Sequence, residues 1–112
     1  MNEEELAKQK CVPCEGGTAP LSEGDAKAFL SRMPSWNLNS DSKKISKQFV
    51  FKDFAEALAF ANKIGAIAEE EGHHPDLAVS WGKVGVELST HAIGGLSQND
   101  FILGAKIDKL LA

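Results

Sequence analysis

The sequence predicts an α+β domain, a four-stranded antiparallel sheet with three helices packed on one face. Apolar residues recur at helical spacing in three segments and at strand spacing in four shorter ones. These segments follow the order α-β-β-α-β-β-α. Strands that come in consecutive pairs, with helices between the pairs, favour antiparallel pairing. Such a sheet has two edges, and sheet edges are a common place for a homo-oligomer to form.

The composition is that of one ordinary globular domain. The chain has 112 residues, of which 43% are hydrophobic and 25% are charged. Its net charge of −4 gives no general attraction to nucleic acid or to an anionic membrane. No apolar stretch approaches the roughly 20 residues of a membrane span, and the acidic start has no apolar run typical of a secretory signal. We therefore expect a cytoplasmic protein without nucleic-acid or membrane partners.

Residues 1–20 form a polar lead-in that we expect to be loosely ordered, so that the domain itself spans 21–112. The two cysteines of the chain, Cys11 and Cys14, lie in this segment as a CxxC pair. Zinc would need two further ligands, and glycines follow where a redox motif would open a helix. The pattern favours a structural or incidental pair of thiols, although a second subunit could complete a ligand set.

The first helix and the first strand pair follow this lead-in. Ser22 is a helix N-cap with an acid three residues later, and the helix extends to about Ser31, before Pro34. Residues 36–38 form a short strand. Residues 45–51 alternate between apolar and polar side chains, which predicts a second strand.

Two further helices have clear start signals. Asp53 caps a helix whose apolar residues keep helical spacing as far as Glu71, and Gly72 is a natural residue to end it. Ser97 caps the last helix. Asp100, three residues on, fits the reciprocal acid of that cap.

A β-hairpin is predicted between these helices, with strands at 77–81 and 84–91 around a Gly82-Lys83 turn. In this register Trp81 lies opposite Val84, and six apolar side chains share one face of the hairpin. We expect that face to pack against the helices.

All three histidines of the chain lie between positions 73 and 91. The hairpin register sets His74 opposite His91, where Cβ atoms of a regular ladder are roughly 5 Å apart, and His73 adjoins them. Pro75 weakens the ladder here, so proximity rather than ideal pairing is expected. Histidine exchanges protons near neutral pH because its unperturbed pKa is about 6.5. Their convergence predicts a proton-transfer site.

Three acids precede the histidines at the end of a helix, where the helix dipole disfavours negative charge by about 0.3–1 kcal/mol each. Glu69, oriented toward the histidines, would explain part of this pattern. For Glu70 and Glu71 a solvated helix end is the favoured interpretation. A zinc or iron site built from the histidines is an alternative, but adjacent His73 and His74 would diverge in an extended chain.

These residues resemble the motif of the pterin-4a-carbinolamine dehydratases, which is an acid, His-His-Pro, an aromatic residue, a later His and an Asp. The matching positions here are Glu69, His73-His74-Pro75, Trp81, His91 and Asp100. The phrase Leu88-Ser89-Thr90-His91 is also typical of the family. The lead-in from Cys11 to Gly17 resembles its bacterial and plastid members, so the likeness covers the chain from about Cys11 onward.

The resemblance implies an activity and a setting. Members remove water from 4a-hydroxytetrahydropterin to give quinonoid dihydropterin, in the recycling of tetrahydrobiopterin after aromatic amino-acid hydroxylases. It implies the α+β fold described above, a homodimer or homotetramer, and no metal or organic cofactor. The alternative is a non-catalytic assembly or interaction factor on the same scaffold. Relatives of that kind tend to lose the histidines that this chain keeps.

The resemblance also suggests roles for the motif residues. His73 and His91 would lie nearest the reacting centre, one as general acid and the other as general base, while His74 would bind the pterin or share the acid role. Pro75 and Glu69 would orient the histidines or the ring. Trp81 fits packing beneath the site better than stacking on a ligand. Asp100 fits a site residue and a helix cap equally well.

Overall fold

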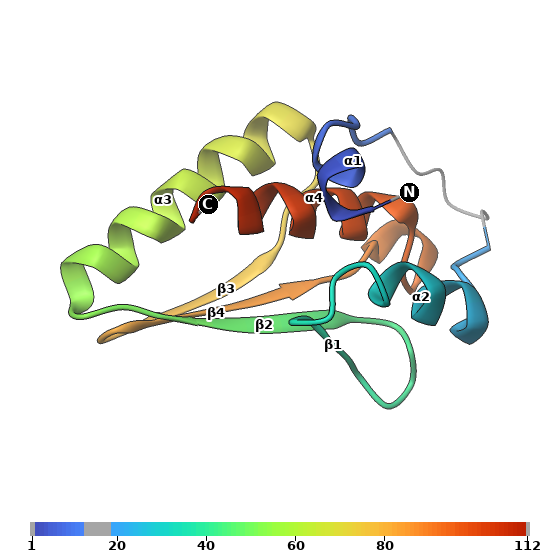
Figure 1. Ribbon diagram of the computed structural model, residues 1–112, viewed down its shortest axis with the longest axis horizontal. Coiled ribbons are helices and arrows are strands. Elements are labelled where there is room, and N and C mark those ends of the chain that lie inside the picture. The colour runs from blue at the N-terminus through green and yellow to red at the C-terminus, as the bar shows by residue number, and fades with distance from the viewer. Residues whose placement is uncertain (1, 13–18, 112) are drawn as a thin grey trace.

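The computed structural model describes residues 2–12 and 19–111, and it has one sheet with helices on one face (Figure 1). The predicted α+β class is confirmed. The helices are α1 (Glu3–Ala7), α2 (Glu23–Leu30), α3 (Phe54–Glu71), α4 (Gln98–Lys109) and the 3₁₀ turn η1 (His91–Ile93). The strands are β1 (Asn37–Leu38), β2 (Ile45–Val50), β3 (Asp76–Ser80) and β4 (Lys83–Leu88).

The sheet is antiparallel with strand order β1-β2-β4-β3, so β4 is central and β1 and β3 form the edges. Side chains of β2 and β4 alternate between a face covered by helices and an open face. Ile45, Phe49, Val84, Val86 and Leu88 are buried beneath the helices. Among the described helices, none has the length and apolar content that crossing a membrane requires.

The predicted caps of the three long helices are confirmed. Ser22 and Asp53 each accept a backbone N–H three residues on, and Ser97 forms a full capping box with Asp100. Gly72 ends α3 with a left-handed φ of +67°. The end of α3 and the start of α4 are therefore both fixed by local sequence.

The expectation of a loosely ordered lead-in is wrong for residues 3–7, which form α1. Asn2 caps this helix by accepting the Glu5 N–H at 2.8 Å, and Leu6 is fully buried. α1 packs on α4. Leu6 and Ala7 are adjacent, so the apolar residues of this segment show no helical periodicity and the sequence pattern did not reveal the helix. Cys14 and the rest of 13–18 lie outside the described residues.

The hairpin turn lies one residue earlier than predicted. Ser80 pairs with Lys83, so the turn residues are Trp81 and Gly82 rather than Gly82 and Lys83. Gly82 has a φ of +70°, which glycine adopts without the steric cost that another residue would meet. The glycine therefore takes the second turn position, the one with the left-handed backbone.

The earlier turn changes cross-strand partners but not faces. Val79 faces Val84 rather than Val86, a shift of two positions. Because side chains alternate with a period of two, an even shift keeps the apolar face of β4 buried. Trp81 leaves the ladder and is 71% exposed, so its predicted position on the apolar face is wrong.

Charged side chains connect α1 to the C-terminal turn of α4. Asp108 accepts hydrogen bonds from Trp36 Nε1 at 3.0 Å and from Lys47 Nζ at 2.7 Å. Glu3 lies against the same carboxylate. Burial raises the pKa of Glu3 to about 7, the neighbouring Asp108 adds to the rise, and Lys47 opposes it. Near neutral pH, Glu3 is therefore divided between its protonated and ionised forms.

We predict that this carboxyl makes the protein less stable as the pH rises. Its folded pKa of about 7 exceeds the ordinary value of 4.5, so the folded state binds the proton more tightly than the unfolded state. The associated stability is complete below about pH 4.5 and is lost as the pH passes 7. Glu3→Gln should flatten this decline in urea unfolding measured from pH 5 to 8. The control Glu4→Gln removes the same charge from an exposed position, and parallel curves for wild type and Glu3→Gln would contradict the prediction.

Candidate active site

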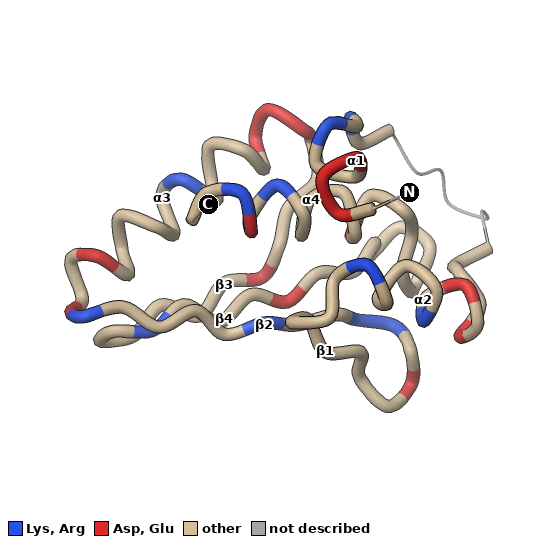
Figure 2. The backbone as a smooth tube through the Cα atoms, viewed as in Figure 1, with Lys and Arg blue, Asp and Glu red and all other residues tan. Residues whose placement is uncertain are grey.

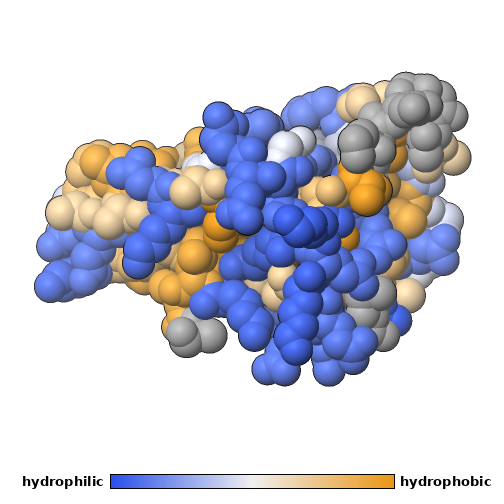
Figure 3. Space-filling view, turned by 90° about the horizontal axis from the view of Figure 1, so that it is seen from above, coloured by the Kyte–Doolittle hydropathy of each residue, from blue (hydrophilic) through white to orange (hydrophobic). Residues whose placement is uncertain are grey.

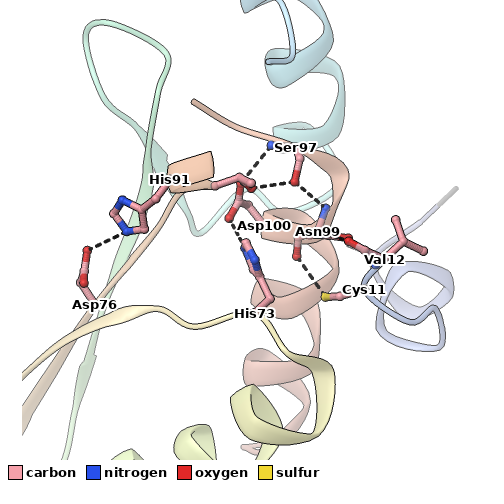
Figure 4. Close-up of polar contacts among 9 residues, drawn as sticks. Cys11, Val12, His73, Asp76, His91, Ser97, Asn99 and Asp100 are labelled. Carbon is pink, nitrogen blue, oxygen red and sulfur yellow. Dashed lines mark hydrogen bonds and ion pairs between the residues drawn. The ribbon is translucent and has the colours of Figure 1, made fainter. Parts of the chain in front are cut away.

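The three histidines line one pocket of about 260 Å³. It lies where four segments meet: the residues after α3, the link from β4 through η1, the first turn of α4, and the N-terminal segment (Figure 4). Its lining residues are Val12, Gly72, His73, His74, Ser89, Thr90, His91, Ala92 and Asn99. The expected convergence of the histidines is therefore present in the structure.

The route to this convergence differs from the prediction. The β3–β4 ladder ends at the pair Asp76 and Glu87, and His91 lies in η1 rather than in a strand. His74 and His91 are therefore not cross-strand partners. The turn at Gly72 brings His73 and His74 to the pocket from one side, and the chain leaving β4 brings His91 from the other.

His73 is the most constrained of the three histidines. Its N–H donates to the carbonyl of Ala68 at 3.3 Å, which continues the end of α3. Its Nε2 lies 2.6 Å from Oδ1 of Asp100, and its side chain is only 12% exposed. A carboxylate accepts but cannot donate, so Nε2 carries the hydrogen of this bond. In the neutral ring, Nδ1 then holds the lone pair.

Asp100 is the reciprocal acid of the helix cap, and it also bonds to a histidine of the pocket. Its Oδ2 accepts the Ser97 N–H at 2.9 Å and the Thr90 hydroxyl at 2.8 Å, while Oδ1 accepts from His73. The side chain is fully buried. Thr90 also lies 2.7 Å from the Ser97 hydroxyl. The helix cap is thus continuous with the support of a pocket histidine (Figure 4).

His74 and His91 also have carboxylate partners, but both pairs are exposed. His74 Nε2 lies 2.5 Å from Glu69 Oε2, with side chains 59% and 79% exposed. His91 Nε2 lies 3.9 Å from Asp76 Oδ2, with side chains 73% and 62% exposed. Glu69 is therefore in contact with one of the histidines. Asp76 follows His-His-Pro at the start of a strand, a position that the motif does not specify.

Glu71 corrects the expectation of a solvated helix end. Its side chain is 6% exposed, and Oε1 accepts the Cys11 N–H at 2.8 Å. Lys106 Nζ lies 4.0 Å from the other carboxylate oxygen. Figure 2 shows the acidic end of α3 beside the N-terminal segment. This segment supplies the donor that offsets an acid at a helix C-terminus, and no local sequence signal pointed to it. Glu70 is exposed, as expected.

Cys11 is held as an uncharged thiol next to this site. Its Sγ–H donates to the Asn99 carbonyl at 3.7 Å. Burial raises the pKa of the Cys11 thiol to about 12, and the Glu71 carboxylate adds to the rise. A protonated thiol is a poor nucleophile and a poor metal ligand. Cys11, the cysteine of the CxxC pair that lies within the described residues, is therefore held as a structural thiol.

Four motif residues are not among those that line the pocket. Glu69 and Asp100 reach it only through the histidines to which they bond, and Trp81 and Pro75 make no such contact with the histidine rings. Trp81 lies in the hairpin turn, at the far end of β3 from the histidines. Pro75 joins His74 to β3 and is partly buried. Trp81 lies away from this pocket because it is at the turn end of the hairpin, whereas the histidines lie beyond its open end. Residues that sequence reasoning missed are Val12, Asn99 and Thr90, which converge only through tertiary contacts.

A larger hollow of about 540 Å³ lies on the open face of the sheet. It includes Asp76 and Glu87 but no histidine, so the smaller pocket is the better candidate for proton transfer. Within residues 2–12 and 19–111, no group of three or more His, Cys, Asp or Glu side chains could hold a metal ion.

Comparison with known proteins supports the family resemblance that the motif indicates. Residues 19–110 match the family model described as pterin 4 alpha carbinolamine dehydratase. A Methylococcus capsulatus protein, provisionally named pterin-4-alpha-carbinolamine dehydratase, is 46% identical over 107 residues, covering 96% of this chain and 94% of its own. An Alkaliphilus metalliredigens protein with the same provisional name is 49% identical over 105 residues, covering 93% and 94%.

Two solved structures have similar folds. One is described as a transcriptional coactivator/pterin dehydratase from Brucella melitensis. It has a TM-score of 0.78 and 27% identity, with 83% of this chain and 99% of that chain covered. The other is described as a pterin dehydratase-like RuBisCO assembly factor in the alpha-carboxysome. It has a TM-score of 0.59 and 25% identity, with 68% and 88% covered.

We predict that Asp100→Asn changes which ring nitrogen of His73 carries the hydrogen. The amide oxygen can replace Oδ2 toward Ser97 and Thr90, but its NH₂ group then faces His73 Nε2, which must become an acceptor. The imidazole ¹⁵N shifts of His73 should show the opposite tautomer, with a loss of about 1–3 kcal/mol in unfolding free energy. Asp76→Asn, at an exposed carboxylate, is the control. An unchanged His73 tautomer would contradict this assignment.

We also predict that the Cys11 thiol is unreactive in the folded protein. In a Cys14→Ser background it is the sole thiol of the chain. Because burial holds it protonated, its reaction with iodoacetamide at pH 8 should be at least about tenfold slower than in urea. Equal rates in the folded and unfolded protein would show that the thiol is not held as described.

Proposed function

Because the chain belongs to the pterin-4a-carbinolamine dehydratase family, we propose that it removes water from 4a-hydroxytetrahydropterin to give quinonoid dihydropterin. One observation carries the proposal: three histidines, each with its own carboxylate partner, line one pocket. Paired imidazoles and carboxylates are the groups that general acid–base chemistry uses near neutral pH. The proposal includes a role in tetrahydrobiopterin recycling, after an aromatic amino-acid hydroxylase, in the cytoplasm.

The reaction needs two proton movements. A proton leaves N5, the C4a–O bond breaks, and a double bond forms between C4a and N5. The departing hydroxide takes a proton and becomes water. One base and one acid placed beside C4a and N5 are sufficient, and neither a metal nor an organic cofactor is required by this balance.

His73 has the arrangement of a general base. Asp100 holds its Nε2–H, so a neutral His73 accepts a proton only through Nδ1. The buried carboxylate also stabilises the ring orientation and offsets the charge that develops when the ring takes a proton. We therefore assign His73 to the N5 proton.

His91 is the proposed general acid. Its side chain is 73% exposed and lies in η1, on the opposite side of the pocket from the residues that follow α3. This arrangement suits protonation of a leaving hydroxyl by a group that then exchanges with water. His74, held by Glu69, would bind the ring or share the acid role. Pro75, which directly follows His74, would restrict the backbone beside the two adjacent histidines.

An assembly or interaction role is the second candidate. The solved structure of a pterin dehydratase-like assembly factor favours it, since a similar fold serves that purpose there. The histidine pocket favours the dehydratase, because an interaction scaffold has no need of three imidazoles supported by carboxylates. A measured dehydration rate distinguishes the two candidates, because only the dehydratase turns over the pterin substrate.

A homodimer or homotetramer is part of the proposal. Figure 3 shows apolar surface gathered over the N-terminal half of α3, where Phe54 and Leu58 are 46% and 44% exposed. Trp81 and Val50 are 71% and 74% exposed. They lie near each other, because Val50 pairs with Lys83, the residue that follows the hairpin turn. Exposed apolar groups of this size are typical of surfaces that another chain covers.

We predict that His73→Ala and His91→Ala each lower dehydration of chemically generated 4a-hydroxytetrahydropterin by about 10²–10⁴-fold. Stopped-flow absorbance can follow the enzymatic rate above the spontaneous rate. Glu69→Ala should lower it less, because this residue acts through His74. Glu70→Ala, at the next exposed acid, is the matched control. Near wild-type rates in both histidine variants, with folding checked by circular dichroism, would refute the proposal.

A further inference from the structure

We propose that residues 11–12 form a wall of the histidine pocket, that Asn99 is the positioning residue that holds this wall, and that the Val12 side chain contacts the bound reduced pterin. This inference rests on the proposed function and deepens it, because it adds a substrate-contacting residue outside the family motif. The observations are the contacts of Asn99, the anchoring of Cys11, and the exposure of Val12 at the pocket.

Asn99 pairs with both backbone groups of Val12. Its Oδ1 accepts the Val12 N–H at 3.0 Å, and its Nδ2 donates to the Val12 carbonyl at 2.5 Å. One side-chain amide thus reproduces the two bonds by which a neighbouring strand would hold a residue. Asn99 is 4% exposed, and a buried amide with both ends bonded has one defined orientation.

The preceding residue is anchored from two helices. The Cys11 N–H donates to Glu71 at the end of α3, and its thiol donates to the Asn99 carbonyl in α4. Terminal segments are usually poorly ordered unless specific contacts hold them. Here two consecutive residues, Cys11 and Val12, are held at defined positions beside the histidines.

The first turn of α4 positions both the wall and His73. Asn99 holds Val12, and the next residue, Asp100, holds His73 (Figure 4). Because adjacent residues of one helical turn keep a fixed relation, the distance between the wall and His73 is fixed as well. A small movement of Asn99 would therefore alter the fit of a ligand between them.

Val12 is the apolar part of this wall. Val12 lines the pocket and is 64% exposed, whereas most of the other lining residues are polar. A reduced pterin is a flat heterocycle with polar edges. Imidazoles suit its edges, and a branched aliphatic side chain suits its face or its substituent. Contact with Val12 would bury apolar surface equally in the bound substrate and in the transition state, which affects KM rather than kcat.

The test compares three variants of the full chain. Asn99→Ala removes both bonds to Val12 and should raise KM about tenfold or more, while Val12→Ala should raise it about three- to tenfold. Both should keep kcat within about twofold. Gln98→Ala is the matched control, because Gln98 bonds to Gln9 in the same segment but does not line the pocket, so its KM should stay at the wild-type value. The Kd for 7,8-dihydropterin, measured by ligand fluorescence, should rise with KM.

The outcomes separate this inference from the proposed function. Wild-type turnover with an unchanged KM and Kd in Asn99→Ala and Val12→Ala would overturn the wall alone. Equal KM increases in Asn99→Ala and Gln98→Ala, in proportion to lost thermal stability, would also overturn it, because a merely structural anchor behaves in that way. A wild-type protein that neither dehydrates the substrate nor binds dihydropterin would overturn both.

Discussion

The carboxylate of Asp100 is buried without any exposed surface, and the donors that it requires determine how this end of the molecule is built. An unpaired buried charge costs several kcal/mol, so its partners must be present whenever the protein is folded. They come from three places: the N-terminus of α4, the segment that follows β4 through Thr90, and the segment that follows α3 through His73. A single charge thereby fixes three segments that the chain order keeps apart. The pocket lies where those segments meet.

The three carboxylate–histidine pairs differ in rigidity because they differ in exposure. His73 is enclosed and bonded at short range, His74 is bonded at the surface, and His91 lies at a longer distance from its partner. In the proposed dehydration, an acid–base pair would benefit from this contrast. A fixed group keeps one geometry toward the substrate, whereas an exposed group can exchange its proton with solvent between turnovers. The fold provides both a fixed and an exposed histidine, using the segments that follow one strand and one helix and the start of a second helix.

The sequence predicted the features that local rules control, namely the fold class, the caps of the long helices and the ends of α3. The convergence of the histidines was also predicted, although it arose from a hairpin register that was wrong by two positions. The even shift preserved the buried face, while it moved Trp81 out of the sheet. The roles of Glu71 and Asn99 could not be predicted, because both depend on an N-terminal segment that lies far away in the chain. For Asp100 the capping rule was correct, but it did not reveal the additional bond to His73.

Successive residues of a helix point in directions roughly 100° apart, and the first turn of α4 uses this rotation to reach different parts of the chain. Gln98, Asn99 and Asp100 bond to Gln9, Val12 and His73 respectively. A rotation of α4 about its own axis would redirect all of these bonds at once. The buried face of α4 and the three bonds of its first turn must therefore agree on a single rotational setting of the helix.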